Sequence, residues 1–276
     1  MAWLCRLARP DVGVVTNVSA AHTEMFGSVN RVAEAKGELV ESLPAAGTAV
    51  LNADDERVMG MASRTRARVL TFGVDKGDVR AEDPALDDEL RVSFRLRTPW
   101  GDAPVRLEAR GLHQAANAAA AAAAALSLDL GLEVDAVADV LGTARLSPWR
   151  MEVARTGAGA LIINDAYNAN PASMAEALKA LAGAPAARRV AIVGPMLELG
   201  ELSDAEHGRM GDLARSLGIR VIAVDAPAYG GEDVANVDEA VALVGKLQRD
   251  DAVLVKASRA AGLERVAAAL LGGAAW

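Results

Sequence analysis

The stretch from Asn164 to Pro171 places an acid, a phenol and three amides within eight residues. An apolar run at 160–163 precedes it, and an alanine- and leucine-rich pattern typical of a helix follows it. Open α/β sheets bind their ligands in crevices at the carboxyl ends of strands, where such a turn would lie. Taken singly, Asn and Asp are also ordinary helix caps and turn residues. The cluster as a unit therefore predicts a ligand-binding turn between a strand and a helix.

Other candidate side chains also follow the ends of predicted strands. His22 comes after the strand predicted at 12–18, and Lys36 lies within the next predicted helix. A lone His in a loop is usually an ordinary polar residue, and a Lys within a helix is usually solvated. Together, however, the two side chains could lie on either side of one crevice. Three more candidates follow the last predicted strand, namely Lys256, Ser258 and Arg259.

Asn117 and Arg150 complete the set of candidate binding residues. Asn117 lies near the start of an alanine-rich helix pattern. Arg150 lies at the predicted joint between two domains, where a guanidinium group can contact a phosphate with two parallel hydrogen bonds. The chain contains no Gly-x-x-x-x-Gly-Lys-Ser/Thr loop of the kind that cradles phosphates in P-loop nucleotidases. A few placed cations and helix N-termini would still suffice to bind a phosphate.

Alternating strand and helix patterns must position these residues. In the first half, strands are predicted at 12–18, 48–52 and 68–72, and helices at 28–43, 54–64, 113–126 and 133–141. Period-two patterns at 92–96 and 105–108 predict antiparallel edge strands. After residue 151, strands are predicted at 159–164, 189–194, 220–225 and 252–256, and helices at 172–183, 204–217, 237–247 and 261–271. The alternation predicts an α/β fold with a doubly wound second domain.

Composition narrows the class of protein. The 276 residues carry a formal net charge of −8, which argues against a general nucleic-acid binder. The single cysteine, Cys5, excludes an internal disulfide and a cysteine-based zinc site, and it fits a reducing compartment. No apolar stretch is long enough for a membrane span, and no signal peptide is recognisable. We therefore expect a cytoplasmic protein whose partners are small molecules, with no nucleic acid and no membrane span.

Several long motifs in order along the chain carry a family resemblance. They cover residues 14–22, 26–28, 35–38, 111–117, 165–171, 193–200 with His207 and Gly211, and 254–259. On these motifs the chain resembles the Mur ligases of peptidoglycan synthesis, most closely the branch that adds D-alanyl-D-alanine. The resemblance implies an α/β fold in which residues 1–149 form the second half of the family's central ATP-binding domain. Residues 150–276 would form its doubly wound, Rossmann-like C-terminal domain.

The resemblance also implies an ATP- and magnesium-dependent amide ligase. ATP would phosphorylate the terminal carboxylate of the UDP-N-acetylmuramoyl tripeptide, and the amine of D-alanyl-D-alanine would attack the acyl phosphate. His22 and Lys36 would hold magnesium, with Lys36 carbamylated because an ammonium group cannot ligate this cation. Asn117 would contact adenine, Arg150 the phosphates as a further catalytic residue, and Asp165 the ribose. The acceptor side would be formed by Asn168, Asn170, Lys256, Ser258 and Arg259.

The sequence departs from the family pattern at three positions. Gln114 stands where Asn is usual, Ala257 where Gly is frequent, and Trp149 where Gly usually precedes the arginine. Trp149 is expected to alter how Arg150 approaches a phosphate. The family's UDP-substrate domain, its P-loop and the glutamate that bridges both magnesium ions would precede residue 1. We therefore expect the chain to represent the C-terminal portion of a ligase and to be inactive by itself.

Two alternatives stay open at this point. The chain could be a truncated, non-catalytic paralogue that binds nucleotide and dipeptide, in which case titration would show binding without turnover. It could instead be a related Mur-like amide ligase with a different acceptor, such as a folylpolyglutamate synthase. The run 167–171 argues against that alternative, and identification of the product by mass spectrometry would decide it.

Overall fold

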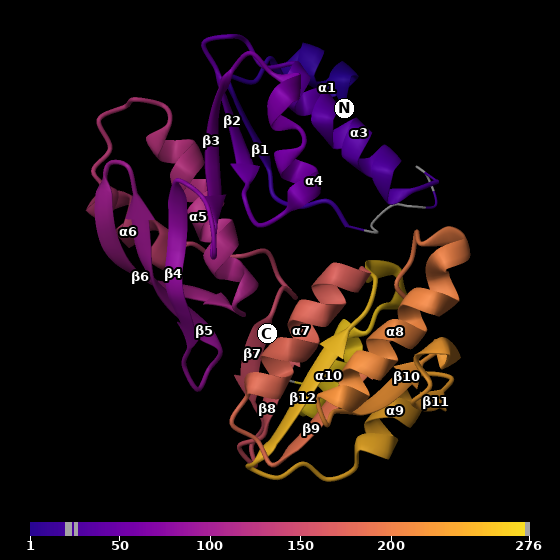
Figure 1. Cartoon of the computed structure of the whole chain (residues 1–276). Helices are drawn as coiled ribbons and strands as arrows, with labels where there is room; N and C mark the ends of the chain where they lie inside the picture. The colour runs from indigo at the N-terminus through magenta and orange to yellow at the C-terminus, as the bar shows by residue number, and fades with distance from the viewer. Residues whose placement is uncertain (20–23, 25–26, 274–276) are drawn as a thin grey trace. The chain divides into compact units, whose positions relative to one another are not determined.

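The computed structural model of the chain describes residues 1–19, 24 and 27–273 (Figure 1). They form two compact units, the first built almost entirely from residues 1–145 and the second from residue 146 onward together with Asp88–Leu90. Each unit has its own sheet and its own buried core. No helix in these ranges combines the length and the apolar content that a membrane crossing requires.

A six-stranded sheet is the framework of the first unit within the described residues. Its strands lie in chain order: β1 (Val12–Val15), β2 (Thr48–Asn52), β3 (Arg68–Gly73), β4 (Val79–Leu86), β5 (Arg91–Thr98) and β6 (Gly101–Arg110). Strands β1 to β4 pair in parallel, and β5 and β6 add to β4 in antiparallel fashion. The antiparallel pair confirms the period-two prediction. Strand β4 was not predicted, because Asp83 at φ 51° and Pro84 interrupt its pairing.

Most helices of the first unit follow the predicted alternation. The helices are α1 (Ala2–Ala8), α3 (Val29–Glu41), α4 (Glu56–Met59), α5 (His113–Leu126) and α6 (Val134–Thr143), with a 3-10 turn at Ala62–Arg64. Helix α1 was not predicted, and the helix predicted at 54–64 is shorter than expected. The Ser28 hydroxyl accepts a hydrogen bond from the Arg31 amide and so caps the start of α3. Helix α5 is almost all alanine, a residue that favours helix and lets the backbone approach the sheet closely. Its buried face and those of β3 to β6 form one core cluster of this unit, and β1, β2, α3 and α4 contribute to another.

The second unit also contains a six-stranded sheet among the described residues. In spatial order its strands are β11 (Glu232–Val234), β10 (Arg220–Val224), β9 (Arg188–Val193), β12 (Asp251–Lys256), β8 (Leu161–Asn164) and β7 (Glu152–Arg155). All neighbours pair in parallel except β7 and β8. The four strands β11-β10-β9-β12 have the 3-2-1-4 order of a Rossmann-type sheet. The doubly wound fold is therefore confirmed, whereas the short edge strands β7 and β11 were not predicted.

The helices of the second unit fall into two packed pairs. Helices α7 (Pro171–Gly183) and α8 (Ser203–Ser216) contact each other, as do α9 (Val237–Val244) and α10 (Glu264–Leu270). The connections through α7 and α8 run one way along the sheet, and the connection through α9 runs the other way (Figure 1). Because such crossovers are right-handed, the two pairs cover opposite faces. The chain thus reverses between β9 and β12, and a ligand crevice is expected at the carboxyl ends of these strands.

Candidate functional site

A buried ion pair lies at the carboxyl ends of β8 and β12. The Lys256 ammonium group donates to the Asp165 carboxylate over 2.5 Å and to the Asn168 carbonyl oxygen over 2.9 Å. Lys256 is only 1% exposed, so its charge depends on these partners. The family resemblance implies that Lys256 belongs to the acceptor side. Its counter-ion is Asp165, the residue that follows the neighbouring strand β8, and the pair fixes the loop after β8 against β12.

The second oxygen of the Asp165 carboxylate anchors another segment. It accepts a hydrogen bond of 3.0 Å from the backbone amide of Met151. Both Trp149 and Met151 have left-handed backbone conformations, with φ values of 59° and 54°. Such conformations cost energy for residues with a side chain, so they persist where surrounding contacts determine them. Asp165 is therefore a point at which the loop after β8, the end of β12 and the segment before β7 are joined.

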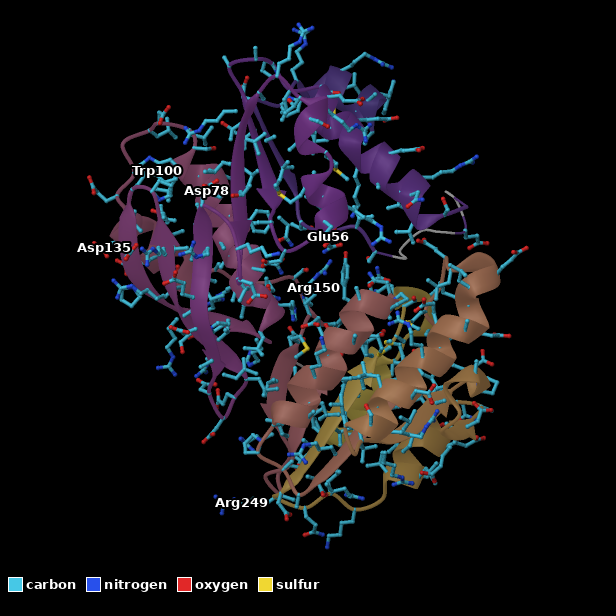
Figure 2. The ribbon with its side chains drawn as sticks, in the orientation of Figure 1. Glu56, Asp78, Trp100, Asp135, Arg150 and Arg249 are labelled. Carbon is cyan, nitrogen blue, oxygen red and sulfur yellow. The ribbon has the colours of Figure 1, made fainter. Side chains whose placement is uncertain are left out.

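Two arginines stack on aromatic rings beside this ion pair. The guanidinium carbon of Arg150 lies 4.1 Å from the centre of the Tyr167 ring, and that of Arg259 lies 4.0 Å from the centre of the Trp149 ring. Arg150, in the segment before β7 (Figure 2), also donates through Nε to the Ser147 hydroxyl. Neither terminal nitrogen of Arg150 has a hydrogen-bond partner in the part of the chain that the structure describes. Stacking thus orients two guanidinium groups, and that of Arg150 still has donors to offer.

The two asparagines of the loop after β8 differ in what they do. The Asn170 side chain accepts from the Ser173 amide, and the Ser173 hydroxyl accepts from the Asn170 amide, so that the two residues form a capping box at the start of α7. Pro171 occupies the first turn of the helix, where its missing N–H costs nothing. The Asn168 side-chain oxygen accepts from the Ala169 amide. Asn170 therefore has a structural role in the described geometry, while the Asn168 carbonyl oxygen binds Lys256.

A small polar cavity of about 210 Å³ opens beside these residues. Its lining comes from the loops after β8, β9 and β12 and consists of Asn168, Ala169, Asn170, Leu197, Glu198, Ser258, Arg259 and Ala260. The Ser258 hydroxyl joins the loops, because it accepts from the Leu197 amide over 2.9 Å and donates to the Ala169 carbonyl oxygen over 3.4 Å. Arg259 also forms an ion pair of 3.1 Å with Glu264. The cavity combines amides, a hydroxyl, the Arg259 cation and the Glu198 carboxylate, which suits a small polar ligand that carries both a carboxylate and an amine.

His207 and Gly211, which belong to the motif after β9, have structural roles. The buried His207 ring accepts from the Met196 amide over 2.8 Å through Nε2 and bonds the Ser203 carbonyl oxygen through Nδ1. It thereby fixes the loop after β9. A side chain at Gly211 would overlap with the carbonyl oxygen of Tyr229. Burial raises the pKa of the Tyr229 phenol, which donates to the Gly194 carbonyl oxygen and stays neutral.

In the first unit, Lys36 projects from α3 toward the end of β1. Its ammonium group donates to the Asn17 carbonyl oxygen over 2.6 Å. Burial lowers the pKa of Lys36, although the Asp55 carboxylate acts in the opposite direction. Asp55 itself accepts from the Val18 amide and caps α4. His22, the predicted partner of Lys36 in a metal site, lies outside the described residues.

Asn117 lies in the first turns of α5, also in the first unit. Its amide nitrogen donates to the Gln114 side-chain oxygen over 2.9 Å. Gln114, the residue that replaces the usual Asn, is buried and thus orients Asn117 from one turn earlier. Within the described ranges, no group of three or more His, Cys, Asp or Glu side chains is arranged to hold a metal ion.

The structure brings together most of the residues that the sequence singled out, all within the second unit. These are Arg150, Asp165, Asn168, Asn170, Lys256, Ser258 and Arg259. Sequence reasoning missed the contribution of Ser173 and the stacking of Trp149 on Arg259. A Ser three residues after an Asn cap is a capping-box pattern and could have been recognised. Nothing in the sequence signals the stacking.

Comparison with known proteins agrees with this geometry. The sequence-family model of the Mur ligase middle domain matches residues 1–125. The family model of the Mur ligase glutamate ligase domain matches residues 149–259. The UDP-N-acetylmuramoyl-tripeptide–D-alanyl-D-alanine ligase of Mycobacterium tuberculosis is 42% identical over 98% of this chain and 60% of its own length. The corresponding enzyme of Escherichia coli is 36% identical over 98% of this chain and 62% of its own length. The chain thus spans about 60% of the length of these relatives.

Solved structures give the same result. MurF from Acinetobacter baumannii matches with a TM-score of 0.89 and 27% identity, over 98% of this chain and 62% of that one. The MurF ligase of Thermotoga maritima, solved in complex with ADP, matches with a TM-score of 0.86 and 29% identity, over 99% and 64% of the two chains. The expected fold class, part of a Mur ligase middle domain followed by the C-terminal domain, is confirmed. The chain belongs to the Mur ligase family.

Proposed function

We propose that the chain provides the nucleotide and acceptor side of an ATP-dependent ligase. The ligase joins D-alanyl-D-alanine to the UDP-N-acetylmuramoyl tripeptide, as the names of its relatives state for those proteins. The observation that carries the proposal is the Lys256–Asp165 pair, which fixes the loop after β8 beside a small polar cavity. That cavity lies at the carboxyl ends of the parallel strands of the second unit, where α/β folds bind ligands.

Each unit contains residues that suit a part of a nucleotide. Asp165 accepts hydrogen bonds only, so it suits the hydroxyl groups of a ribose. Arg150 is oriented by the Tyr167 ring and has free terminal nitrogens among the described residues, so it suits phosphate oxygens. Asn117, oriented by Gln114, presents an amide that suits the edge of adenine.

The dipeptide would occupy the small cavity beside the loop after β8. Asn168 and Ser258 offer polar contacts to its peptide group, and Arg259 offers a cation to its terminal carboxylate. In this proposal Lys256 does not touch the substrate. It is a positioning residue, because its ammonium group is bound to Asp165 and to the Asn168 carbonyl oxygen.

Magnesium fits the first unit only if Lys36 is modified. As an ammonium group Lys36 donates a hydrogen bond to Asn17 and cannot ligate a cation. Its lowered pKa favours the neutral amine, which adds carbon dioxide to form a carbamate and releases one proton. The carbamate oxygens, together with His22, would then hold the ion. Bound magnesium would neutralise charge on the phosphates.

The chain's own residues then act by positioning rather than by covalent chemistry. Arg150 would orient the phosphate, and Asp165 would set the position of the nucleotide. The cavity residues would direct the dipeptide amine at the acyl phosphate, which forms an amide and releases phosphate. Phosphoryl transfer depends mainly on such positioning and on charge neutralisation.

Turnover requires a phosphate cradle that the 276 residues do not contain in P-loop form. We therefore propose that this chain by itself binds its small-molecule partners without making the product. Formation of ADP and of the ligated pentapeptide product by the purified chain, followed by mass spectrometry, would contradict this part of the proposal.

Isothermal titration with D-alanyl-D-alanine tests the acceptor site directly. The chain is expected to bind the dipeptide, and Asn168→Ala is expected to weaken binding by roughly tenfold, the effect of losing one or two polar contacts. Asn30→Ala, an exposed change on α3, is the matched control and should leave binding unchanged. Absence of binding, or equal binding by both variants, would contradict the proposed acceptor site.

A further inference from the structure

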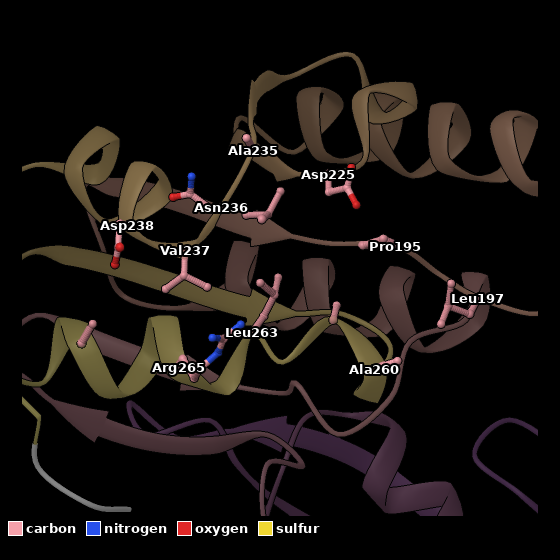
Figure 3. Close-up of a pocket in the computed structure, with 13 residues that line it drawn as sticks. Pro195, Leu197, Asp225, Ala235, Asn236, Val237, Asp238, Ala260, Leu263 and Arg265 are labelled. Carbon is pink, nitrogen blue, oxygen red and sulfur yellow. The ribbon is translucent and has the colours of Figure 1, made fainter.

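A second and larger cavity of about 660 Å³ lies elsewhere in the second unit (Figure 3). It is separate from the small polar cavity, although Leu197 and Ala260 line both. Figure 3 shows Asp225, Asn236 and Asp238 along one wall and Leu263 and Arg265 along the other. A volume of this size is typical of sites for small organic ligands. The proposed ligase function does not use this cavity.

The strand order places this cavity where Rossmann-type folds bind a nucleoside. Strands β9, β10, β11 and β12 correspond to strands 1, 2, 3 and 4 of that arrangement. The cavity is lined by the loops and helix starts that follow these strands. In Rossmann folds an acidic residue shortly after the second strand binds the ribose hydroxyl groups. Asp225 directly follows β10, which is the second strand here.

Asp225 is placed to receive such hydroxyl groups. Its backbone has a left-handed conformation with φ 51°, and its amide donates to the Val234 carbonyl oxygen, so its position is fixed. Its carboxylate has no hydrogen bond or ion pair with any residue that the structure describes. A carboxylate accepts bonds from two neighbouring hydroxyl groups, one at each oxygen.

The turn after β9 differs from a phosphate-binding turn. Such turns cradle phosphate with free backbone N–H groups. Here the Gly194 amide donates to the Lys256 carbonyl oxygen, Pro195 has no N–H, and the Met196 amide donates to His207. The next amide, that of Leu197, donates to Ser258. These groups are all engaged, so the cavity has no cradle for phosphate at this turn.

The remaining lining favours an uncharged ring. Apolar side chains from the ends of β10, α9 and α10 form most of the walls, among them Val224, Val237 and Leu263. The polar groups are mainly acidic, namely Asp225 and Asp238, and Arg265 donates through Nε to the Gly262 carbonyl oxygen. Two carboxylates against the single cation of Arg265 leave a net negative charge, which disfavours an anionic ligand at this position.

We propose that this cavity binds an unphosphorylated ribonucleoside. The base packs between the apolar walls, and the Asp225 carboxylate accepts hydrogen bonds from the ribose hydroxyl groups. The closed turn after β9 and the excess of carboxylates over cations disfavour phosphorylated forms. None of the residues that line this cavity is among those proposed for the nucleotide, namely Asn117, Arg150 and Asp165.

Titration of the 276-residue chain with adenosine, followed by saturation-transfer NMR and calorimetry, tests this proposal. Asp225→Asn is expected to weaken adenosine binding by roughly tenfold, because a charge-assisted bond to ribose is lost. Asn tolerates the left-handed backbone, so the variant should fold. Asp233→Asn, an exposed change on β11 outside the cavity, should leave binding unchanged. 2′-Deoxyadenosine and AMP should both bind more weakly than adenosine.

Three results would overturn the inference. Adenosine binding could be absent, could be equal in Asp225→Asn and Asp233→Asn, or could be weaker than the binding of AMP. Loss of all adenosine binding in Asn117→Ala, with Asp225→Asn unaffected, would place adenosine in the proposed nucleotide site alone. That last outcome would overturn this inference while leaving the proposed ligase function intact.

Discussion

The Lys256 ammonium group lies 2.5 Å from the Asp165 carboxylate, although 91 residues separate them in the chain. Lys256 is the last residue of β12, and Asp165 is the first after β8, so the parallel pairing of these strands brings them together. The pair is almost completely removed from solvent. Its geometry fixes the Asp165 to Pro171 loop from which the proposed nucleotide and acceptor contacts arise.

Loss of Lys256 should destabilise the second unit. Lys256→Met leaves a buried carboxylate without its partner, which typically costs about 3 kcal/mol or more. Hydrogen exchange of the amides in β8 and β12 would measure this loss. Lys179→Met, which removes the exposed pair of Lys179 with Glu176, should cost at most about 0.5 kcal/mol. Equal effects of the two changes would show that the Lys256 pair does not stabilise the sheet.

Substitution of Trp149 should have two opposing effects on the stability of the fold. Its φ of 59° is a conformation that favours Gly, the residue usual in the family, while its ring stacks under Arg259. Trp149→Ala loses the stacking and keeps the backbone strain, whereas Trp149→Gly loses both. We therefore expect the Gly variant to be more stable than the Ala variant by about 1 kcal/mol in urea denaturation. Equal stability of the two variants would argue against strain at this position.

Acid stability should depend on Asp251. The Arg188 guanidinium lowers the pKa of this carboxyl, burial opposes the shift, and the Gln248 amide adds to it. A carboxyl with a lowered pKa in the folded state contributes stability above its unfolded pKa of about 3.9. That stability is lost as the pH falls through the folded pKa. Denaturation between pH 6 and pH 2, a window of roughly two units on either side of that unfolded value, should show a shallower acid loss for Asp251→Asn than for the unchanged chain. An identical slope would contradict the assignment.

Lys36 should form a carbamate in the presence of carbon dioxide. Burial lowers its pKa, so a larger fraction of the amine is neutral and reactive near pH 8, roughly two units below the ordinary lysine value. Carbon-13 NMR in labelled bicarbonate should show two carbamate signals, one from the Met1 α-amine and a second that grows with pH and is absent in Lys36→Met. The exposed Lys76 provides the control, since Lys76→Met should keep both signals. A second signal that survives in Lys36→Met would place the modification elsewhere.

Much of the fold could be predicted from local pattern. Helix α5 was predicted at its observed bounds because alanine favours helix throughout 113–126. Strands β8, β9, β10 and β12 were predicted within two residues of their ends, since parallel strands buried on both faces are continuous apolar runs. Strands β7 and β11 are short edge strands without such a run. They form because they pair with a neighbouring strand, which their composition does not reveal.

The candidate site was predictable in part. The polar turn at Asp165 to Pro171 and the position of Lys256 after a strand were both recognisable. The burial of Lys256 was not, because it depends on a partner 91 residues away. The same reason hides the hydrogen bond between Asp165 and the Met151 amide and the stacking of Arg259 on Trp149. Long-range pairs of this kind follow from topology, which local patterns do not specify.

The most direct test of the central claim is to locate the dipeptide on the chain. In a nitrogen-15 NMR titration with D-alanyl-D-alanine, the largest shift changes should fall on the amides at 168–170, 197–198 and 258–260, which line the small polar cavity. Amides of the larger cavity near Asp225 and Asn236 should change little. Changes concentrated away from the small cavity, or none at saturating dipeptide, would contradict the account.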